Sequence, residues 1–457
     1  MLFNSQVFLI GFLPAVLLLY YGLAASRAWR QAAVVLASLV FYGYWDIRFV
    51  PLLVGLTVAN WLIARLHGAG IVPGVALAGI VLNLAVLGLF KYANFFADSF
   101  AAAFGTTHRA WDIILPIGIS FFVFQKISYL ADLRRGDRHI YGFLDFCMFV
   151  AFFPQLIAGP LVRHNEIIHQ FDQAPRRAEM WENLSRGLTL LVIGLAKKVG
   201  IADTVAGVCD PLFAKAAHAS LSMAEAWAAA GTFTLQIYFD FSGYSDMAIG
   251  LALMFGLRLP LNFDAPYRAT SIRDFWRRWH MTLSRFLRDY VYIPLGGNRL
   301  GPLRQAVNVV ITMLLGGLWH GANWTFVAWG GLHGAALALN GAWDRAGWRL
   351  PRPLGWLLTI LFVIACWVLF RAPDFATAGG VLASMTGMHG LGAASLKPAW
   401  VVALGAGIAL IGWTSQDFVL ARLSAHKWIA PLVGILLVLA LILIGGRLQH
   451  DFIYFQF

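Results

Sequence analysis

A histidine stands inside an otherwise apolar stretch of the chain, LLGGLWHGANW, which covers residues 314–324. This residue, His320, is followed about one helical turn later by Asn323. Glycines that permit close approach of backbone or substrate flank the histidine: Gly316, Gly317 and Gly321. A lone buried histidine is usually hydrogen-bonded core. The glycines, and a second histidine at His280 in a basic context, favour chemistry instead, and a neutral imidazole is the natural base for a hydroxyl near neutral pH.

The second histidine lies in a basic segment, SIRDFWRRWHMTLSRFLRDYVY, which covers residues 271–292. On a helix its large apolar side chains share one arc: Trp276, Trp279, Leu283, Phe286 and Tyr290. Its arginines lie opposite: Arg273, Arg277, Arg285 and Arg288. The pattern predicts one amphipathic helix with Ser271 as its N-cap and His280 between the two faces. Either this helix lies at the lipid headgroups, or it lines a polar cavity whose arginines bind the phosphates of a nucleotide-bearing donor.

Polar side chains also interrupt the apolar segment QIYFDFSGYSDMAIG, residues 236–250: Asp240, Ser242, Tyr244 and Asp246. Carboxylates at membrane depth are costly and usually face a cavity or a charged partner. These residues are therefore candidates for lining a substrate path. For Asp240 or Asp246, an ion pair with an arginine of the basic segment is a simpler interpretation than direct catalysis.

The amino-acid composition indicates which kind of secondary structure holds these polar groups in place. Of 457 residues, 60% are hydrophobic and 12% are charged, about half the charged fraction of a soluble domain. Apolar stretches near the length of a membrane-spanning helix recur along the chain: Val7–Ala24, Val72–Phe90, Leu188–Val205, Leu354–Phe370 and Pro431–Gly446. The third stretch is the weakest candidate for a membrane-spanning helix, because Lys197 and Lys198 interrupt it. The sequence predicts an all-α polytopic membrane protein, a single integral domain over residues 1–457 whose catalytic middle spans about residues 238–333.

The remaining features narrow the function. The net charge of +12 comes largely from short basic loops, which favour the cytoplasmic side and do not require nucleic acid as a partner. The first apolar stretch reads as a retained helix, since no basic region precedes it and no cleavage site is evident. Cysteines 147, 209 and 366 sit in apolar sequence and predict small core residues. Neither a phosphate-binding loop nor a zinc-protease motif is present, and no metal site is expected.

The motifs resemble those of the membrane-bound O-acyltransferases of the bacterial alginate O-acetyltransferase type, from MLFNSQVFLIGFLP at the start to FIYFQF at the end. The most specific matches are LPIGISFFVFQKISYLAD, FFPQLIAGP, YFDFSGYSDMAIGL, FWRRWHMTLSRFLRDYVYIPLGGNR and LLGGLWHGANWTFVAWGGLHG. The resemblance implies a multi-helix fold with re-entrant helices and a central tunnel, in a multi-pass protein of the bacterial inner membrane. It matches His320 to the catalytic histidine and His280 to the second family histidine.

The resemblance also implies the reactants. The donor is acetyl-CoA on the cytoplasmic side, and no bound cofactor is needed because a thioester is already activated. The acceptor is a hydroxyl of an exported polysaccharide, usually reached with a periplasmic partner acetyltransferase. His320 would take the proton of the attacking hydroxyl, and His280 or Asn323 would hold the oxyanion.

The chain ends with the segment FIYF, Phe452–Phe455, which is similar to the F-x-Y-F terminus of partner peptides in D-alanylation systems. Tyr454 is therefore a candidate covalent acyl carrier. The alternative is an aromatic anchor at the membrane interface.

Two other functions fit a polar centre in a membrane protein. A transporter or flippase of a lipid-linked sugar would tolerate replacement of His320 by alanine if its cavity survived. A scaffold of a polysaccharide export complex would tolerate loss of either histidine. The sequence leaves open which polymer is modified, alginate, cellulose and peptidoglycan included, and whether the acyl chain is longer than acetyl.

Overall fold

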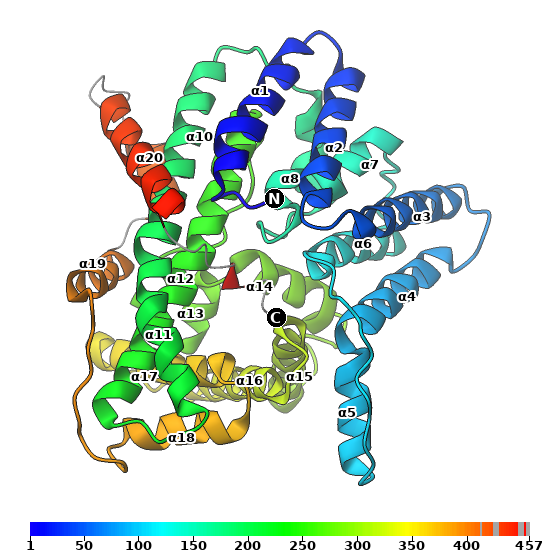
Figure 1. The fold of residues 1–457 in the computed structure, drawn as a ribbon. Helices are drawn as coiled ribbons and strands as arrows, with labels where there is room; N and C mark the ends of the chain where they lie inside the picture. The colour runs from blue at the N-terminus through cyan, green and yellow to red at the C-terminus, as the bar shows by residue number, and fades with distance from the viewer. Residues whose placement is uncertain (412–413, 424–428, 447–451, 454–457) are drawn as a thin grey trace. The chain divides into compact units, whose positions relative to one another are not determined.

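The computed structural model describes residues 1–411, 414–423, 429–446 and 452–453. Within these ranges the regular elements are α-helices with short π- and 3₁₀-helical segments, and no strand occurs among them. The all-α prediction is confirmed. The chain, whose helices are drawn in Figure 1, divides into two compact units. Unit 1 comprises Met1–Ile193, Tyr244–Pro260 and Ala425–Leu448, and unit 2 comprises the rest. The organisation as a single integral domain stays a prediction.

Unit 1 begins with apolar helices whose starts are marked by local sequence. Pro14 stands in the first turn of α1, where its missing N–H costs nothing. The Ser26 side chain accepts a hydrogen bond from the Trp29 N–H and caps α2. The elements of unit 1 are η1 (Val7–Phe12), α1 (Leu13–Gly22), α2 (Arg27–Gly43), η2 (Ile47–Phe49), α3 (Val50–Gly68), α4 (Val75–Leu87), η3 (Gly88–Tyr92), α5 (Ala93–Ala103), α6 (Ile119–Arg134), α7 (Phe143–Ala151), α8 (Phe153–Leu156), α9 (His164–Ile167), η4 (Ile168–Asp172), most of α10 (Met180–Leu195) and α20 (Ile429–Gly446).

Unit 2 holds both histidine motifs. Its elements are η5 (Ala196–Ala202), α11 (Asp203–Ala216), the first part of α12 (Met223–Met254), η6 (Pro266–Arg268), α13 (Ile272–Arg278), α14 (Met281–Leu287), η7 (Arg288–Tyr292), α15 (Gly301–His320), α16 (Trp324–Arg345), α17 (Arg352–Arg371), α18 (Phe375–Met385), α19 (Ala399–Leu410) and η8 (Asp417–Arg422). Helices α15 and α16 pack side by side, and α16 also packs on α13 and α17. Helix α12 passes from unit 2 into unit 1 after Gly243.

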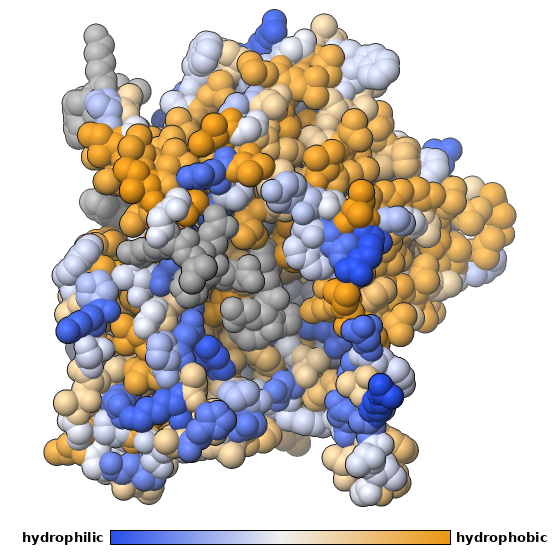
Figure 2. All heavy atoms as spheres, viewed as in Figure 1, coloured by the Kyte–Doolittle hydropathy of each residue, from blue (hydrophilic) through white to orange (hydrophobic). Residues whose placement is uncertain are grey.

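Four helical segments among the described residues are long and apolar enough to cross a membrane: Ile47–Gly68, Val75–Ala103, Arg352–Arg371 and Ile429–Gly446. Each of them exposes large apolar side chains, such as Val81 and Leu84 in the second segment and Leu357 and Leu358 in the third, as contact with lipid requires. Figure 2 shows hydrophobic residues over α3, where Val54 and Leu62 are exposed. Two predicted stretches are not among these segments. Val7–Ala24 forms a shorter apolar helix, Val7–Gly22, and Leu188–Val205 covers the end of α10, η5 and the start of α11. The three cysteines are buried, which confirms them as core residues.

The basic segment departs from its prediction. Ser271 does cap the first helix, since its hydroxyl accepts a hydrogen bond from the Asp274 N–H at 3.1 Å. The segment is not one helix, however, because α13 ends at Arg278 and α14 begins at Met281. Trp279 is extended, and His280 has a left-handed backbone with φ 43° and ψ 53°. The break places His280 at a corner of the backbone.

Candidate catalytic site

The corner at His280 is held by a neighbouring segment. A non-glycine residue in the left-handed region costs about 1–3 kcal/mol and persists only when its surroundings fix it. The backbone carbonyl of Asn262 accepts a hydrogen bond from the Met281 N–H at 2.9 Å. The Asn262 side-chain oxygen lies 3.1 Å from Nδ1 of His280 and accepts the Thr282 hydroxyl at 2.9 Å. Asn262 therefore fixes both the backbone and the ring of a fully buried histidine.

His320 is the last residue of α15, and the extended Gly321 that follows ends the helix there. Its ring, which is 3% exposed, lies in an aromatic enclosure. The centroids of Trp319, Trp329 and Phe370 are 4.9, 5.1 and 5.2 Å from the imidazole centroid. Such surroundings exclude bulk water and strengthen any electrostatic interaction made by the ring.

The structure brings the two predicted histidines together, although 40 residues separate them in the chain. The ring centroids of His280 and His320 are 6.3 Å apart at an interplanar angle of 61°. Trp319 lies against both rings, with centroid distances of 5.9 Å to His280 and 4.9 Å to His320. Two imidazoles at this spacing, both buried, can serve a single reacting group between or beside them.

The glycines around His320 have a packing role. A Cβ on Gly317 would lie 2.2 Å from the Phe326 carbonyl oxygen, and one on Gly330 would lie 2.2 Å from the Met313 carbonyl oxygen. A Cβ on Gly321 would meet the Phe326 ring at 2.2 Å. The backbones of α15 and α16 therefore approach more closely than any side chain allows. Close approach of backbone was predicted here, and helix packing accounts for these glycines.

Asn323 is engaged elsewhere. Its side-chain oxygen accepts the Thr325 N–H at 3.0 Å as the N-cap of α16. Its side-chain nitrogen donates to the Pro373 carbonyl at 2.8 Å. Both ends of the amide are therefore occupied by structural contacts, and the oxyanion role of Asn323 stays a prediction.

The apolar arc of the basic segment packs as predicted, but its arginines have separate surroundings. Trp276, Trp279, Leu283 and Phe286 are buried. Arg273 pairs with Asp344, Arg288 pairs with Asp289 at 2.6 Å, Arg277 is exposed, and Arg285 is half-buried. Donor binding by these arginines stays a prediction.

The polar residues of α12 fall in different units. Asp240 and Ser242 are buried in unit 2, whereas Tyr244 and Asp246 are buried in unit 1, where the Tyr244 ring stacks on Phe3 at 4.8 Å. The sequence suggested that Asp240 pairs with an arginine of the basic segment, and this prediction is wrong. Asp240 pairs with Lys198 at 2.7 Å, because η5 packs against α12 at this level. Lysine in an apolar stretch was the available signal for this pair.

Sequence reasoning missed three further residues of the site. Trp329 lies between two histidines, with its centroid 5.1 Å from His320 and 4.9 Å from His333. Trp276 donates its indole N–H to Nδ1 of the fully buried His333 at 3.2 Å. The GGLHG sequence that carries His333 was a signal for this residue. No sequence signal pointed to Asn262, because its partners, His280 and Thr282, lie 18 and 20 residues further along the chain.

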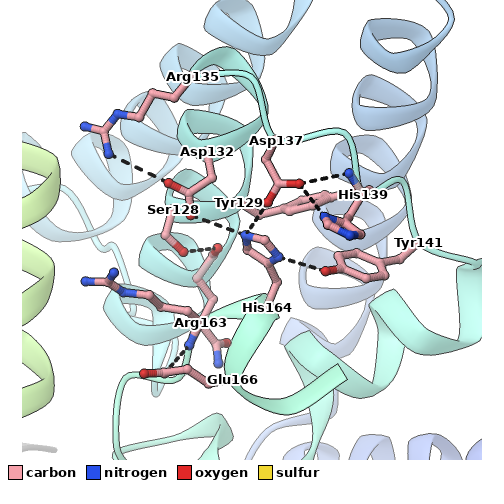
Figure 3. Close-up of polar contacts among 11 residues, drawn as sticks. Ser128, Tyr129, Asp132, Arg135, Asp137, His139, Tyr141, Arg163, His164 and Glu166 are labelled. Carbon is pink, nitrogen blue, oxygen red and sulfur yellow. Dashed lines mark hydrogen bonds and ion pairs between the residues drawn. The ribbon is translucent and has the colours of Figure 1, made fainter. Parts of the chain in front are cut away.

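A separate polar cluster lies in unit 1 (Figure 3). The buried His164 of α9 has its Nδ1 3.0 Å from the Tyr141 hydroxyl and its Nε2 3.3 Å from an Asp132 oxygen. Asp137 lies 3.6 Å from the same nitrogen. Burial raises the pKa of Asp137. Hydrogen bonds from His139 and the charge of His164 lower this pKa by more than burial raises it, so the pKa lies below its usual range. The cluster ties the loop after α6 to α9.

Replacing Tyr141 with phenylalanine should therefore destabilise unit 1 modestly. The change removes the hydroxyl beside His164, and one lost hydrogen bond costs about 0.5–1.5 kcal/mol. A lower thermal unfolding midpoint in detergent would show the effect. Tyr44→Phe is the matched control, because Tyr44 is 60% exposed. Equal midpoints for the two variants would mean that the contact adds no stability.

Comparison with known proteins places these motifs in a family. The family model of MBOAT, the membrane-bound O-acyltransferases, matches residues 78–374. The chain is 41% identical over 429 residues to a peptidoglycan O-acetyltransferase of Helicobacter pylori, covering 86% of this chain and 81% of that protein. It is 46% identical over 400 residues to the Azotobacter vinelandii protein named "Probable alginate O-acetylase AlgI", covering 84% and 78%.

A more distant relative acts on another polymer by name. A teichoic acid D-alanyltransferase of Streptococcus thermophilus is 29% identical over 238 residues, covering 50% of this chain and 57% of that protein. The names of the nearer relatives support acyltransferase activity, and the apolar helices fit a membrane protein. The matched region contains both His280 and His320. The chain belongs to the membrane-bound O-acyltransferase family.

Proposed function

We propose that this protein moves an acetyl group from acetyl-CoA to a hydroxyl of an exported polysaccharide, either directly or through a periplasmic partner transferase. The observation that carries the proposal is the buried pair of His280 and His320, with ring centroids 6.3 Å apart, in a chain whose relatives are named O-acetyltransferases. Such a centre suits acyl transfer from a thioester, which needs a base but no phosphate-binding loop.

His320 is the base in this proposal. Its imidazole accepts the proton of the attacking hydroxyl while the hydroxyl oxygen bonds to the thioester carbonyl carbon. The tetrahedral intermediate then expels the CoA sulfur as the carbon–sulfur bond breaks. The imidazolium returns its proton to the thiolate, so the products are an acetyl ester and CoA. The aromatic enclosure of His320 keeps water from competing as the nucleophile.

The surroundings of His280 limit its role. The Asn262 side-chain oxygen faces the Thr282 N–H at 3.4 Å and its hydroxyl at 2.9 Å, so this atom is an acceptor. The hydrogen shared with His280 therefore lies on Nδ1. A neutral His280 then carries a lone pair at Nε2, and it can donate a hydrogen bond to an oxyanion only as the imidazolium. An oxyanion role for His280 therefore requires the imidazolium, which full burial of the ring disfavours, so this role stays a prediction.

In this proposal the donor and the acceptor reach the histidine pair from opposite sides of the membrane. Acetyl-CoA carries phosphates that suit Arg273, Arg277, Arg285 and Arg288 on the cytoplasmic side. The acceptor and a partner acetyltransferase belong on the periplasmic side of a bacterial inner membrane. Transfer at a centre reached from both sides spares the membrane from passing CoA.

A cellular experiment separates this function from transport. A strain without the gene would be complemented with the wild-type chain or with His320→Ala, and the exported polymer would be isolated. We expect the variant to lose O-acetyl groups per sugar while the amount of exported polymer stays unchanged. A fall in exported polymer with unchanged acetylation would instead support a transporter.

Tyr454 lies outside the described residues, and we propose it as a covalent acyl carrier. In that step the phenol oxygen takes the acetyl group from CoA as an ester, and the acceptor hydroxyl then takes it from the tyrosine. Replacing Tyr454 with phenylalanine should abolish protein-bound label from radiolabelled acetyl-CoA. Tyr44→Phe, which removes an exposed hydroxyl far along the chain, should keep the label. Full acetylation of polysaccharide by the Tyr454 variant would rule out the carrier.

A further inference from the structure

A buried group of three charges lies in unit 2, apart from the two histidines. Nζ of Lys198, in η5, lies 2.8 Å from Asp203 and 2.7 Å from Asp240. The three side chains are 3%, 11% and 3% exposed. With both carboxylates ionised, the group carries one excess negative charge, and a buried negative charge is costly unless donors surround it.

The C-terminal segment supplies contacts of the right kind. The backbone N–H of Ile453 donates to the second oxygen of Asp240 at 2.8 Å, across 213 positions of sequence. The neighbouring Phe452 presents its ring to the Lys198 ammonium, with 5.6 Å between Nζ and the ring centroid. Both residues are buried, at 4% and 3% exposure. The Ile453 N–H thus donates a hydrogen bond to the Asp240 carboxylate, and the face of the Phe452 ring contacts the Lys198 ammonium.

The helices that carry the charges are held in register. A Cβ on Gly243 of α12 would lie 2.8 Å from the Gly194 carbonyl oxygen and 3.3 Å from the Lys198 N. The backbone of α12 therefore contacts the chain at the start of η5 directly. This contact holds Asp240 opposite Lys198 independently of the contacts made by Phe452 and Ile453.

We infer that Lys198, Asp203 and Asp240 form a binding site for the peptide segment that contains Phe452 and Ile453, and that this site positions the segment for acyl transfer. Lys198 pairs with Asp203 and with the first oxygen of Asp240, and the second oxygen of Asp240 accepts the Ile453 N–H. The positioning part of the inference rests on the proposed function.

Helix α12 connects this peptide site to the histidine pair. Phe241 directly follows Asp240, and its ring centroid lies 4.7 Å from that of His280. His280 in turn lies 6.3 Å from His320. The segment is therefore anchored one residue along α12 from a side chain that packs on the catalytic centre. Asp240 and Lys198 act as positioning residues in this account.

Digestion of the full chain by a carboxypeptidase measures the binding directly. Intact mass spectrometry of the protein in nanodiscs would follow the removal of residues up to and including Phe452. Trimming follows the population in which the segment is released. Because a hydrogen bond to a charged group is lost, Asp240→Leu should speed this step at least about tenfold, and Asp240→Asn should speed it less.

The matched control is Asp374→Asn, since Asp374 caps α18 through its side chain and asparagine caps nearly as well. This variant should be trimmed at the wild-type rate. If Asp240→Leu does not fold, Phe452→Leu removes the π face while leaving the three charges in place, and it should also be trimmed faster. Wild-type trimming rates for folded Asp240→Leu or for Phe452→Leu would overturn the inference.

Release of CoA from acetyl-CoA tests the positioning role separately. Turnover should fall in the order wild type, Asp240→Asn, Asp240→Leu, while KM for acetyl-CoA stays near the wild-type value. Faster trimming with unchanged turnover would overturn the positioning role. Absence of CoA release from the wild-type chain would contradict the proposed function, and the trimming rates would still decide whether the peptide site exists.

Discussion

Replacing His320 with glutamine is expected to lower the rate of CoA release from acetyl-CoA by about 10²- to 10⁴-fold, the range that a positioned general base contributes. Glutamine keeps polar atoms and much of the side-chain volume, but it cannot take a proton near neutral pH. The loss should appear in kcat, because the base acts on the attacking hydroxyl and not on donor binding. Steady-state assays in nanodiscs with a hydroxyl acceptor would measure it.

A matched variant separates chemistry from folding. His218→Gln changes an exposed histidine of unit 2 and should keep wild-type turnover. The thermal unfolding midpoint of His320→Gln should lie close to that of this control, since the aromatic enclosure remains. Turnover within a few-fold of wild type in the folded His320 variant would remove the histidine from the mechanism and return the transporter and scaffold to consideration.

Replacing Gly317 with alanine should be strongly destabilising, although the change adds a single methyl group. The new Cβ would lie 2.2 Å from the Phe326 carbonyl oxygen and 3.1 Å from the Gly330 Cα. Both neighbours are backbone atoms, so relief requires α15 and α16 to separate. Overpacking of this kind costs about 1–3 kcal/mol or more, and here we expect the upper end. The expected result is a sharp loss of folded protein and of thermal stability.

The control for this change is Gly231→Ala in α12, where a Cβ meets nothing within 4 Å. Alanine is favoured over glycine in a helix by about 1 kcal/mol, so this variant should be neutral or slightly more stable. Detergent-solubilised yield and the unfolding midpoint would be compared for the two variants. A Gly317→Ala protein as stable as Gly231→Ala would show that the helices do not approach as described.

Much of the candidate site was predictable from local sequence. The apolar composition predicts membrane helices, and the WHG and RWH motifs single out His320 and His280, which the structure places together. The burial of Trp276 in α13 and of Leu283 and Phe286 in α14 follows from helical periodicity, because each helix keeps the period on its own side of the break at His280. Periodicity alone therefore could not reveal the break.

The remaining features depend on contacts between distant parts of the chain. The left-handed corner at His280 is fixed by Asn262, 18 residues earlier, and no local pattern predicts a positive φ in histidine. The partner of Asp240 is a lysine from an apolar stretch, because tertiary packing and not proximity in sequence selects it. Gly317 and Gly321 beside His320 are required by α16, which follows them in the chain.

The central claim is transfer of an acetyl group, and a balance of products tests it most directly. Wild-type protein in sealed liposomes would receive acetyl-labelled acetyl-CoA on one side and the hydroxyl acceptor on the other. We predict one acetyl ester on the acceptor for each CoA released on the donor side, with both products lost in His320→Gln. Label that crosses the membrane as intact acetyl-CoA, or acceptor that stays unmodified while no CoA is released, would contradict the account.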